Sequence, residues 1–145
     1  MGMQFTMTLE GSLDVAKALK ELGDQAEPAL RAALYEEGNA LLNDSKAVCP
    51  VDTTRLITSG YVKPATAQDL EVVVGYGGAA APYALTVHEN PRSGKTGGVS
   101  PSGRAYKHWA SVGEWKYLER PFIARVFGYY DRIAQSLRRS LLKGG

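Results

Sequence analysis

Apolar and polar side chains alternate along residues 3–9, from Met3 to Leu9. A period of two residues is typical of a strand that is buried on one face, so this stretch predicts a strand. After Gly11, apolar residues return at every third position up to Leu22. This spacing predicts a short helix that ends at Gly23, because glycine readily adopts the backbone conformation that follows a helix.

The longest pattern covers residues 26–48, where apolar residues such as Leu30 and Leu34 recur at helical spacing. It predicts the longest helix of the chain, with Asp24 in place to cap its first turn. Pro50 should end this helix, because proline disfavours the helical conformation of the residue before it.

The stretch beyond the long helix has the composition of strands. Residues 56–62 contain β-branched and aromatic side chains, and Leu70, Val72 and Val74 follow after a polar turn. Two such stretches joined by a short polar loop predict a β-hairpin. Residues 83–89 are apolar, but the segment is too short for periodicity to distinguish a helix from a strand.

Residues 91–112 are rich in glycine, serine, proline and basic residues, which predicts a long flexible loop. Beyond it, apolar residues from Phe122 to Leu141 recur every three or four positions. This series predicts a single amphipathic helix, with Pro121 near its first turn. The polar side of that helix carries Arg125, Arg132, Arg138 and Arg139.

These elements predict an α+β fold, in which a small antiparallel or mixed β-sheet is packed by a long N-terminal helix and a C-terminal helix. With 145 residues, the chain is expected to form a single domain over residues 1–145. Hydrophobic residues make up 44% of the sequence and charged residues 22%, and these fractions are typical of a globular protein.

Composition also excludes several classes of function. The net charge of +2 is too small to predict a nucleic acid or an anionic membrane as a partner. The single cysteine, Cys49, excludes an internal disulfide. No apolar run approaches the ~20 residues of a membrane span, and the first residues do not resemble a secretory signal. We therefore expect a soluble, intracellular protein without a membrane partner.

One fragment of the sequence is similar to a phosphate-binding loop, namely Ser-Gly-Lys-Thr at residues 93–96. The full motif requires a glycine where Glu89 stands, and a helix that opens at Lys95. Glycines and a proline follow Lys95 instead. Nucleotide binding is therefore not expected.

The thiol and imidazole groups of the chain are Cys49, His88 and His108, and their spacing does not match a structural metal site. Cys49 stands at an apolar helix end, where a small buried residue is expected. Asp52 and Glu89 offer carboxylates, but no sequence feature brings them together as an acid–base pair. We expect no enzyme activity, no cofactor and no metal.

The turn at residues 50–56 is a candidate docking corner. Asp52 can bond the backbone of the turn, and Arg55 then presents a planar guanidinium just beyond it. We expect Arg55 to reach a carboxylate or a carbonyl, in this chain or on a neighbouring subunit. The alternative is an ordinary arginine in contact with solvent.

Two further features have alternative interpretations. The arginines of the last helix could contact nucleic-acid phosphates, but Asp131 and Gln135 lie among them and favour a solvated helix face. Trp109 and Trp115 belong to a group of aromatic residues beside the predicted loop. Part of that group must enter the core, and the rest fits a protein–protein surface.

Three segments form an ordered set along the chain. They are residues 50–56 (Pro-Val-Asp-Thr-Thr-Arg-Leu), residues 82–90 (Pro-Tyr-Ala-Leu-Thr-Val-His-Glu-Asn) and residues 113–122 (Gly-Glu-Trp-Lys-Tyr-Leu-Glu-Arg-Pro-Phe). This set resembles the neck, or tail-completion, proteins of long-tailed bacteriophages. The corresponding family patterns are Pro-Val-Asp-Thr-Gly-Arg-Leu, Tyr-Ala-x-x-Val-His-Glu and Lys-Phe-Leu-Glu-Arg-Pro. One departure is Thr54, where the family has a glycine.

The resemblance implies a structural virion protein whose copies form a homo-oligomeric ring of about six subunits. Such a ring joins head to tail and lets DNA pass through its lumen without reading the sequence. Its implied partners are head–tail connector proteins and the tail terminator or tail tube protein. Assembly is implied in the host cytoplasm, and the final location is the neck of the virion.

The resemblance and the residue types together predict a set of side chains that contact other proteins. These are Asp52, Arg55, His88, Glu89, Trp109, Trp115, Lys116 and Arg120. The alternative function is a small nucleic-acid-binding or enzymatic protein that uses the basic C-terminal helix.

Overall fold

The computed structural model describes residues 3–8, 23–50, 54–78, 81–90, 98–99, 105–106 and 113–143. The helices in these ranges are α2 (Ala26–Val48), α3 (Thr54–Thr58), α4 (Ala81–Glu89), α5 (Glu119–Val126) and α6 (Tyr129–Lys143). The strands are β1 (Met3–Thr8), β2 (Gly60–Lys63), β3 (Glu71–Tyr76), β4 (Gly98–Val99) and β5 (Ala105–Tyr106). No described helix is long and apolar enough to cross a lipid bilayer.

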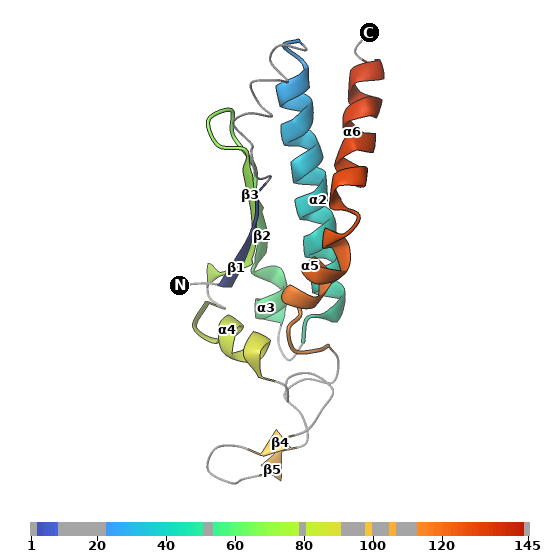
Figure 1. Cartoon of the computed structure of the whole chain (residues 1–145). Coiled ribbons are helices and arrows are strands. Elements are labelled where there is room, and N and C mark those ends of the chain that lie inside the picture. The colour runs from blue at the N-terminus through green and yellow to red at the C-terminus, as the bar shows by residue number, and fades with distance from the viewer. Residues whose placement is uncertain are drawn as a thin grey trace.

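The main sheet is antiparallel, and its strands lie in the order β1-β3-β2. In β3, Val74 pairs with Phe5 of β1 on one side and with Val62 of β2 on the other. Helix α2 lies between this sheet and the C-terminal helices, so the molecule has three layers (Figure 1). The predicted α+β fold, with a small sheet, a long helix packed on it and C-terminal helices, is confirmed, and the C-terminal helices lie against α2 on the side away from the sheet.

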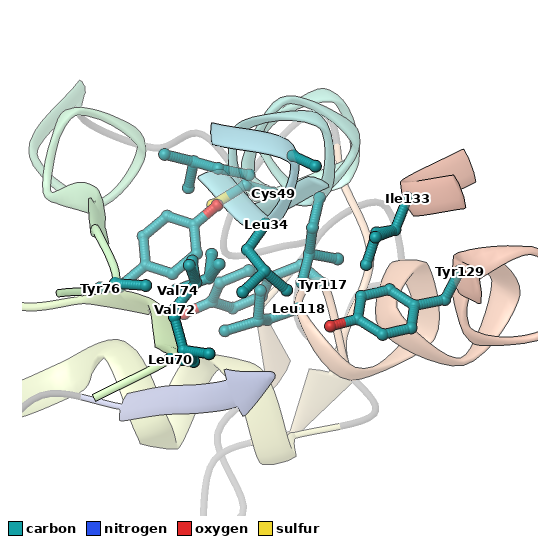
Figure 2. Packing of buried hydrophobic residues seen from close by; sticks show 14 of the residues in the cluster. Leu34, Cys49, Leu70, Val72, Val74, Tyr76, Tyr117, Leu118, Tyr129 and Ile133 are labelled. Atoms are coloured by element: carbon teal, nitrogen blue, oxygen red, sulfur yellow. The ribbon is translucent and has the colours of Figure 1, made fainter. Parts of the chain in front are cut away.

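The core lies between α2 and the sheet, where α2 has the helical periodicity that the sequence predicted and β3 is buried at every position from Val72 to Tyr76. Leu34 and Leu41 of α2 are fully buried, and so are Val72 and Val74 of β3. Figure 2 shows these layers meeting around Tyr117, which comes from the segment before α5. The packing of the helix against the sheet removes these apolar side chains from water.

The strand predicted over residues 56–62 is wrong in its first part, because α3 occupies residues 54–58. The hydroxyl of Thr58 donates to the carbonyl of Thr54 at 2.7 Å and so closes a helical turn. Leu56 points into the core and is 4% exposed. The strand begins only at Gly60, and its antiparallel pairing with β3 confirms the predicted hairpin.

The predicted cap of the long helix is also wrong. The N-cap residue of α2 is Gln25, and no side-chain hydrogen bond caps this end. The first turn is closed by the backbone instead, since the N–H of Ala26 donates to the carbonyl of Gly23 at 3.2 Å. The helix ends at Val48, as the position of Pro50 predicted.

The single C-terminal helix predicted from Phe122 to Leu141 is two helices, α5 and α6, separated at Phe127 and Gly128. In a continuous helix the carbonyl of Arg125 would accept from the N–H of Tyr129. Here it accepts from the N–H of Gly128 at 3.1 Å and from the Arg132 side chain at 2.6 Å. The arginine thereby stabilises the end of α5.

Two other expectations have mixed outcomes. Residues 83–89, which fit either a helix or a strand, belong to α4. Inside the predicted loop at 91–112, β4 and β5 form a short antiparallel pair. The rest of that loop, and the helix predicted before Gly23, lie outside the described residues.

Candidate functional site

The described parts of the three segments of the ordered set meet at the C-terminal end of α2. The N–H of Glu114 donates to the carbonyl of Val48 at 2.8 Å, which joins the third segment to the helix end beside Pro50. The N–H of Lys116 donates to the carbonyl of His88 at 2.8 Å, which joins the same segment to α4. Residues 113–118 therefore connect two elements that are far apart in the sequence.

Two backbone conformations let residues 113–118 pass through this junction. Gly113 has φ +97°, and a Cβ there would lie 2.6 Å from the carbonyl carbon of Cys49 and closer still to the backbone of Pro50. Lys116 adopts φ 56°, which L residues rarely do. The junction thus requires a glycine at 113, and it turns Lys116 toward α4.

His88 is the buried centre of the junction, with 1% of its surface exposed. Its Nδ1 lies 2.7 Å from Oε1 of Glu89, and its Nε2 accepts from the backbone N–H of Glu119 at 3.3 Å. A neutral ring that carries its proton on Nδ1 satisfies both contacts. Burial lowers the pKa of His88, so the neutral form is favoured.

Two tyrosines extend this buried centre toward the sheet. The rings of His88 and Tyr117 meet edge to face, with centroids 5.1 Å apart, and Tyr117 makes the same kind of contact with Tyr76 of β3. The hydroxyl of Tyr117 donates to the carbonyl of Ala84 in α4 at 2.9 Å. The sheet, α4 and the segment before α5 are therefore held in one arrangement.

The outer rim of the junction is charged. The ammonium of Lys116 donates to Glu89 at 2.7 Å and to Glu119 at 2.8 Å. These bonds, with Glu119 the stronger influence, raise the pKa of Lys116. Lys116 and then His88 lower the pKa of Glu89, so the ion pairs persist to mildly acidic pH.

Beside this rim, Trp115 lies between two cations. The guanidinium carbon of Arg120 is 5.3 Å from the centre of the Trp115 ring, and the Lys116 ammonium is 5.9 Å from it. Arg120 also donates to Glu114 at 3.2 Å. A half-buried tryptophan beside an exposed arginine and exposed carboxylates is typical of a surface that binds another protein.

The cluster of His88, Glu89 and Glu119 has ligand atoms within 4.8 Å of one another, close enough to hold a metal ion. Those atoms are already engaged, because Lys116 bridges the two carboxylates and Glu89 contacts the imidazole. None of these side chains is a hydroxyl or thiol nucleophile. The arrangement therefore favours a structural role, in which these side chains hold α4 against the start of α5, over a metal site or a catalytic site.

Cys49 lies apart from this cluster and is buried at the end of α2, as the sequence predicted, with 1% of its surface exposed. Burial raises the pKa of Cys49 to about 12. The thiol therefore stays protonated at neutral pH and is a poor nucleophile. Figure 2 shows it packed among core residues near Tyr76.

Of the predicted contact residues, five come together at the junction: His88, Glu89, Trp115, Lys116 and Arg120. Arg55 does not join them. It is exposed on α3 and lines a shallow hollow with Tyr61 and Gly77, and it makes no ion pair with any described residue. Asp52, Trp109 and His108 lie outside the described residues, so the proposed turn bond of Asp52 is not visible.

A second charged cluster was missed by the sequence analysis. Glu37 of α2 is 7% exposed and accepts from Arg132 through Nε at 2.8 Å and Nη2 at 3.1 Å. Arg125 donates to the same carboxylate at 3.4 Å and to Asp44 at 2.6 Å. The signal was present in the sequence, because Glu37 falls on the apolar face between Leu34 and Leu41.

The buried imidazole predicts a loss of stability in mild acid. Because the folded pKa of His88 lies below its ordinary value of 6.5, the unfolded chain binds more protons below that pH. Stability contributed by the neutral ring is therefore complete above about pH 6.5 and falls as the pH drops toward the folded pKa. Urea unfolding at several pH values between about 5 and 7 measures how the free energy of unfolding changes with pH.

The variant His88→Gln keeps an acceptor and a donor but does not titrate in this range. It should be less stable at neutral pH and should have a flatter pH dependence than the parent chain. His108→Gln is the control for the other imidazole. An unchanged slope in His88→Gln would contradict the role assigned to the buried ring.

Comparison of the chain with models of protein families, with curated proteins and with solved structures found no match.

Proposed function

We propose that this chain is a structural protein of the neck of a long-tailed bacteriophage, in which copies form a ring that joins the head connector to the tail. The proposal rests on the ordered set of segments at 50–56, 82–90 and 113–122, which resembles that family. DNA would pass through the ring without sequence recognition. Such a protein acts by binding its own copies and the neighbouring proteins, and it catalyses no reaction.

One structural observation supports the proposal above all others. The described parts of the three segments converge at the end of α2, although about sixty residues separate the first from the last. Segments that are held together by Glu114 and Lys116 can be recognised as one surface. A shared surface explains why tryptophan and arginine occur in one set, and the buried His88 supports that surface from within.

The alternative nucleic-acid function is weakened by the second charged cluster. Arg125 and Arg132 are bound to Glu37 and are not available to phosphates. Arg139 donates to Ser136 and lies 4.0 Å from Glu36. Since phosphate contacts need several free cations on one face, the engagement of Arg125 and Arg132 leaves only Arg138, Arg139 and Lys143 exposed for such contacts among the basic residues of α5 and α6 beyond Arg120.

Arg55 provides the sharpest test of the proposed function. Its exposed guanidinium sits on a short rigid helix, so we expect it to bind a carboxylate or carbonyl of a neighbouring protein. The variant Arg55→Ala should keep its melting temperature within about 2 °C, because exposed substitutions change stability little. The yield of joined head–tail particles in a complementation assay should fall at least about tenfold, as loss of a buried charged partner costs roughly 2–5 kcal/mol.

Lys63→Ala is the matched control, since Lys63 is also exposed and basic but lies on β2. It should leave both measurements unchanged. If Arg55→Ala gave a normal yield of joined head–tail particles, the turn at residues 50–56 would not be a docking corner. Absence of the chain from the neck in a reconstruction of the particle would remove the proposed function itself.

A further inference from the structure

Strand β2 is an outer strand of the main sheet, and it pairs with β3 along one edge only. Just before the strand begins, the N–H of Gly77 donates to the carbonyl of Ser59 at 3.2 Å. Hydrogen-bonded positions alternate along an antiparallel pair, so Tyr61 is the next residue whose backbone groups bond β3. The N–H and carbonyl groups of Gly60 and Val62 therefore point away from the sheet.

These outward backbone groups are open. The sheet ends at β2, and the outward groups of Gly60 and Val62 bond no other residue in the described part of the chain. Both residues are partly exposed. An edge of this kind can take up an extended segment of another protein, which then becomes an additional strand.

Two cations flank the end at which the chain enters β2. The side chain of Lys46 in α2 covers Gly60, since a Cβ at Gly60 would lie 2.9 Å from its Cε. Arg55 in α3 lies on the other side, in the shallow hollow that it forms with Tyr61. Neither Lys46 nor Arg55 makes an ion pair with another described residue. This end of the open edge therefore favours an anionic group.

The hollow beside Arg55 leaves room for the backbone of another chain. Gly77 and Gly78 belong to its lining. Because glycine has no side chain, a second backbone can approach closely at such positions. A Cβ at Gly78 would meet no atom within 4 Å, so the space above this residue is open.

We propose that β2 binds an extended acidic segment of a neighbouring protein as a fourth strand of the three-stranded sheet, with a carboxylate of that segment held by Arg55 and Lys46. Antiparallel addition brings the carboxyl end of the segment to the start of β2, next to both cations. The carboxylate is then the terminus of the partner or an acidic side chain close to it. Nucleic acid fits less well, because its phosphates would leave the open backbone groups unpaired.

This inference rests on the proposed function, since it describes how the corner at Arg55 would hold a neighbouring protein of the neck. The two nevertheless fail separately. A reconstruction of the particle should show a strand of another protein beside Gly60 and Val62. A chain that lies in the neck with this edge bare would overturn the inference alone, whereas absence of the chain from the neck would overturn the proposed function.

Binding by the purified chain is measured by fluorescence anisotropy with a short probe peptide of alternating valine and threonine, labelled at its amino end. The peptide is made with a free terminal carboxylate, with an amidated end, and with an amidated end that follows a final aspartate. The forms that carry a carboxylate should bind at least about tenfold more tightly than the neutral amide, and the tighter of these two identifies the source of the anion. Equal binding of all three forms, absence of binding, or competition by a short DNA duplex would overturn the proposal.

The open edge is tested by Val62→Pro, because proline removes the outward N–H of this residue. It should weaken the binding of every form of the peptide at least about tenfold. Thr6→Pro is the matched control. Thr6 lies opposite Val73, so by the same alternation it loses an outward N–H from the other outer strand, β1, and it should bind the peptides like the parent chain. Melting temperatures show whether each variant folds.

The charged end is tested by Arg55→Ala, which leaves the strand itself intact. This variant should lose the preference for a carboxylate, and Lys63→Ala, at the far end of β2, should keep it. Equal losses of binding in Val62→Pro and Thr6→Pro would overturn the proposal. A carboxylate preference that survives in Arg55→Ala would overturn it as well.

Discussion

Replacing Gly113 with alanine is expected to lower the free energy of unfolding by about 3–5 kcal/mol. The added Cβ would meet the backbone of Cys49 and Pro50, and backbone atoms at a helix end have little room to move. The backbone at Gly113 also has φ +97°, which a residue with a Cβ adopts only with strain. Chemical denaturation monitored by tryptophan fluorescence measures the loss.

Gly78→Ala is the matched control for this prediction. Gly78 also has a positive φ, +61°, but a Cβ there would meet no atom within 4 Å. Its substitution should cost only the conformational strain, about 1 kcal/mol. The difference between the two variants isolates the clash with Pro50. Equal losses would mean that residues 113–118 can move away from the end of α2.

The elements that the sequence predicted well are those in which apolar residues recur at a regular spacing along the sequence. Leu30 and Leu34 mark the buried face of α2, and Val72 and Val74 mark that of β3. Helix α2 packs against the sheet on one side and against α5 and α6 on the other, and β3 is buried at every position from Val72 to Tyr76. The α+β class follows from these two patterns because a helix and a sheet with one apolar face each must cover one another.

The elements that were predicted wrongly depend on side-chain bonds that a period does not show. Thr58 closes α3 by donating to a backbone carbonyl, although threonine favours strands by propensity. The break before α6 depends on Arg132, which reaches back to the carbonyl of Arg125 and across to Glu37. A Cβ at Gly128 would meet only the end of the Arg132 side chain, so a larger residue there would displace the guanidinium that bonds Arg125 and Glu37.

The junction could be predicted only in part. The motifs identified Glu89, Lys116 and Arg120 one by one as contact residues, but not that Lys116 bonds Glu89 across 27 positions of the sequence. That contact follows from the packing of Tyr117 between β3 and α4, which has no local signature. Residue types reveal candidate surfaces, whereas their assembly into one site is a property of the tertiary fold.

The second large effect concerns Glu37, whose replacement by alanine should destabilise the chain by roughly 2–4 kcal/mol. This carboxylate is almost buried and bonds both Arg125 and Arg132, so its removal takes one acceptor from each of two partly buried guanidinium groups. Arg125 keeps Asp44 as a partner, but Arg132 makes its carboxylate bonds to Glu37. The loss of stability should therefore weaken mainly the attachment of α6 to α2.

Glu36→Ala is the matched control, because Glu36 is the neighbouring residue, contacts the same helix and has 64% of its side chain exposed. Its loss should change the free energy of unfolding by no more than about 0.5 kcal/mol. Glu37→Gln keeps one acceptor oxygen, so its free energy of unfolding should lie between those of Glu37→Ala and Glu36→Ala. Hydrogen exchange should show earlier opening of α6 than of α2 in Glu37→Ala, since α2 keeps its contacts with the sheet. If Glu37→Ala proved as mild as Glu36→Ala, the apolar contacts of Tyr129 and Ile133 alone would suffice to hold α6 on α2.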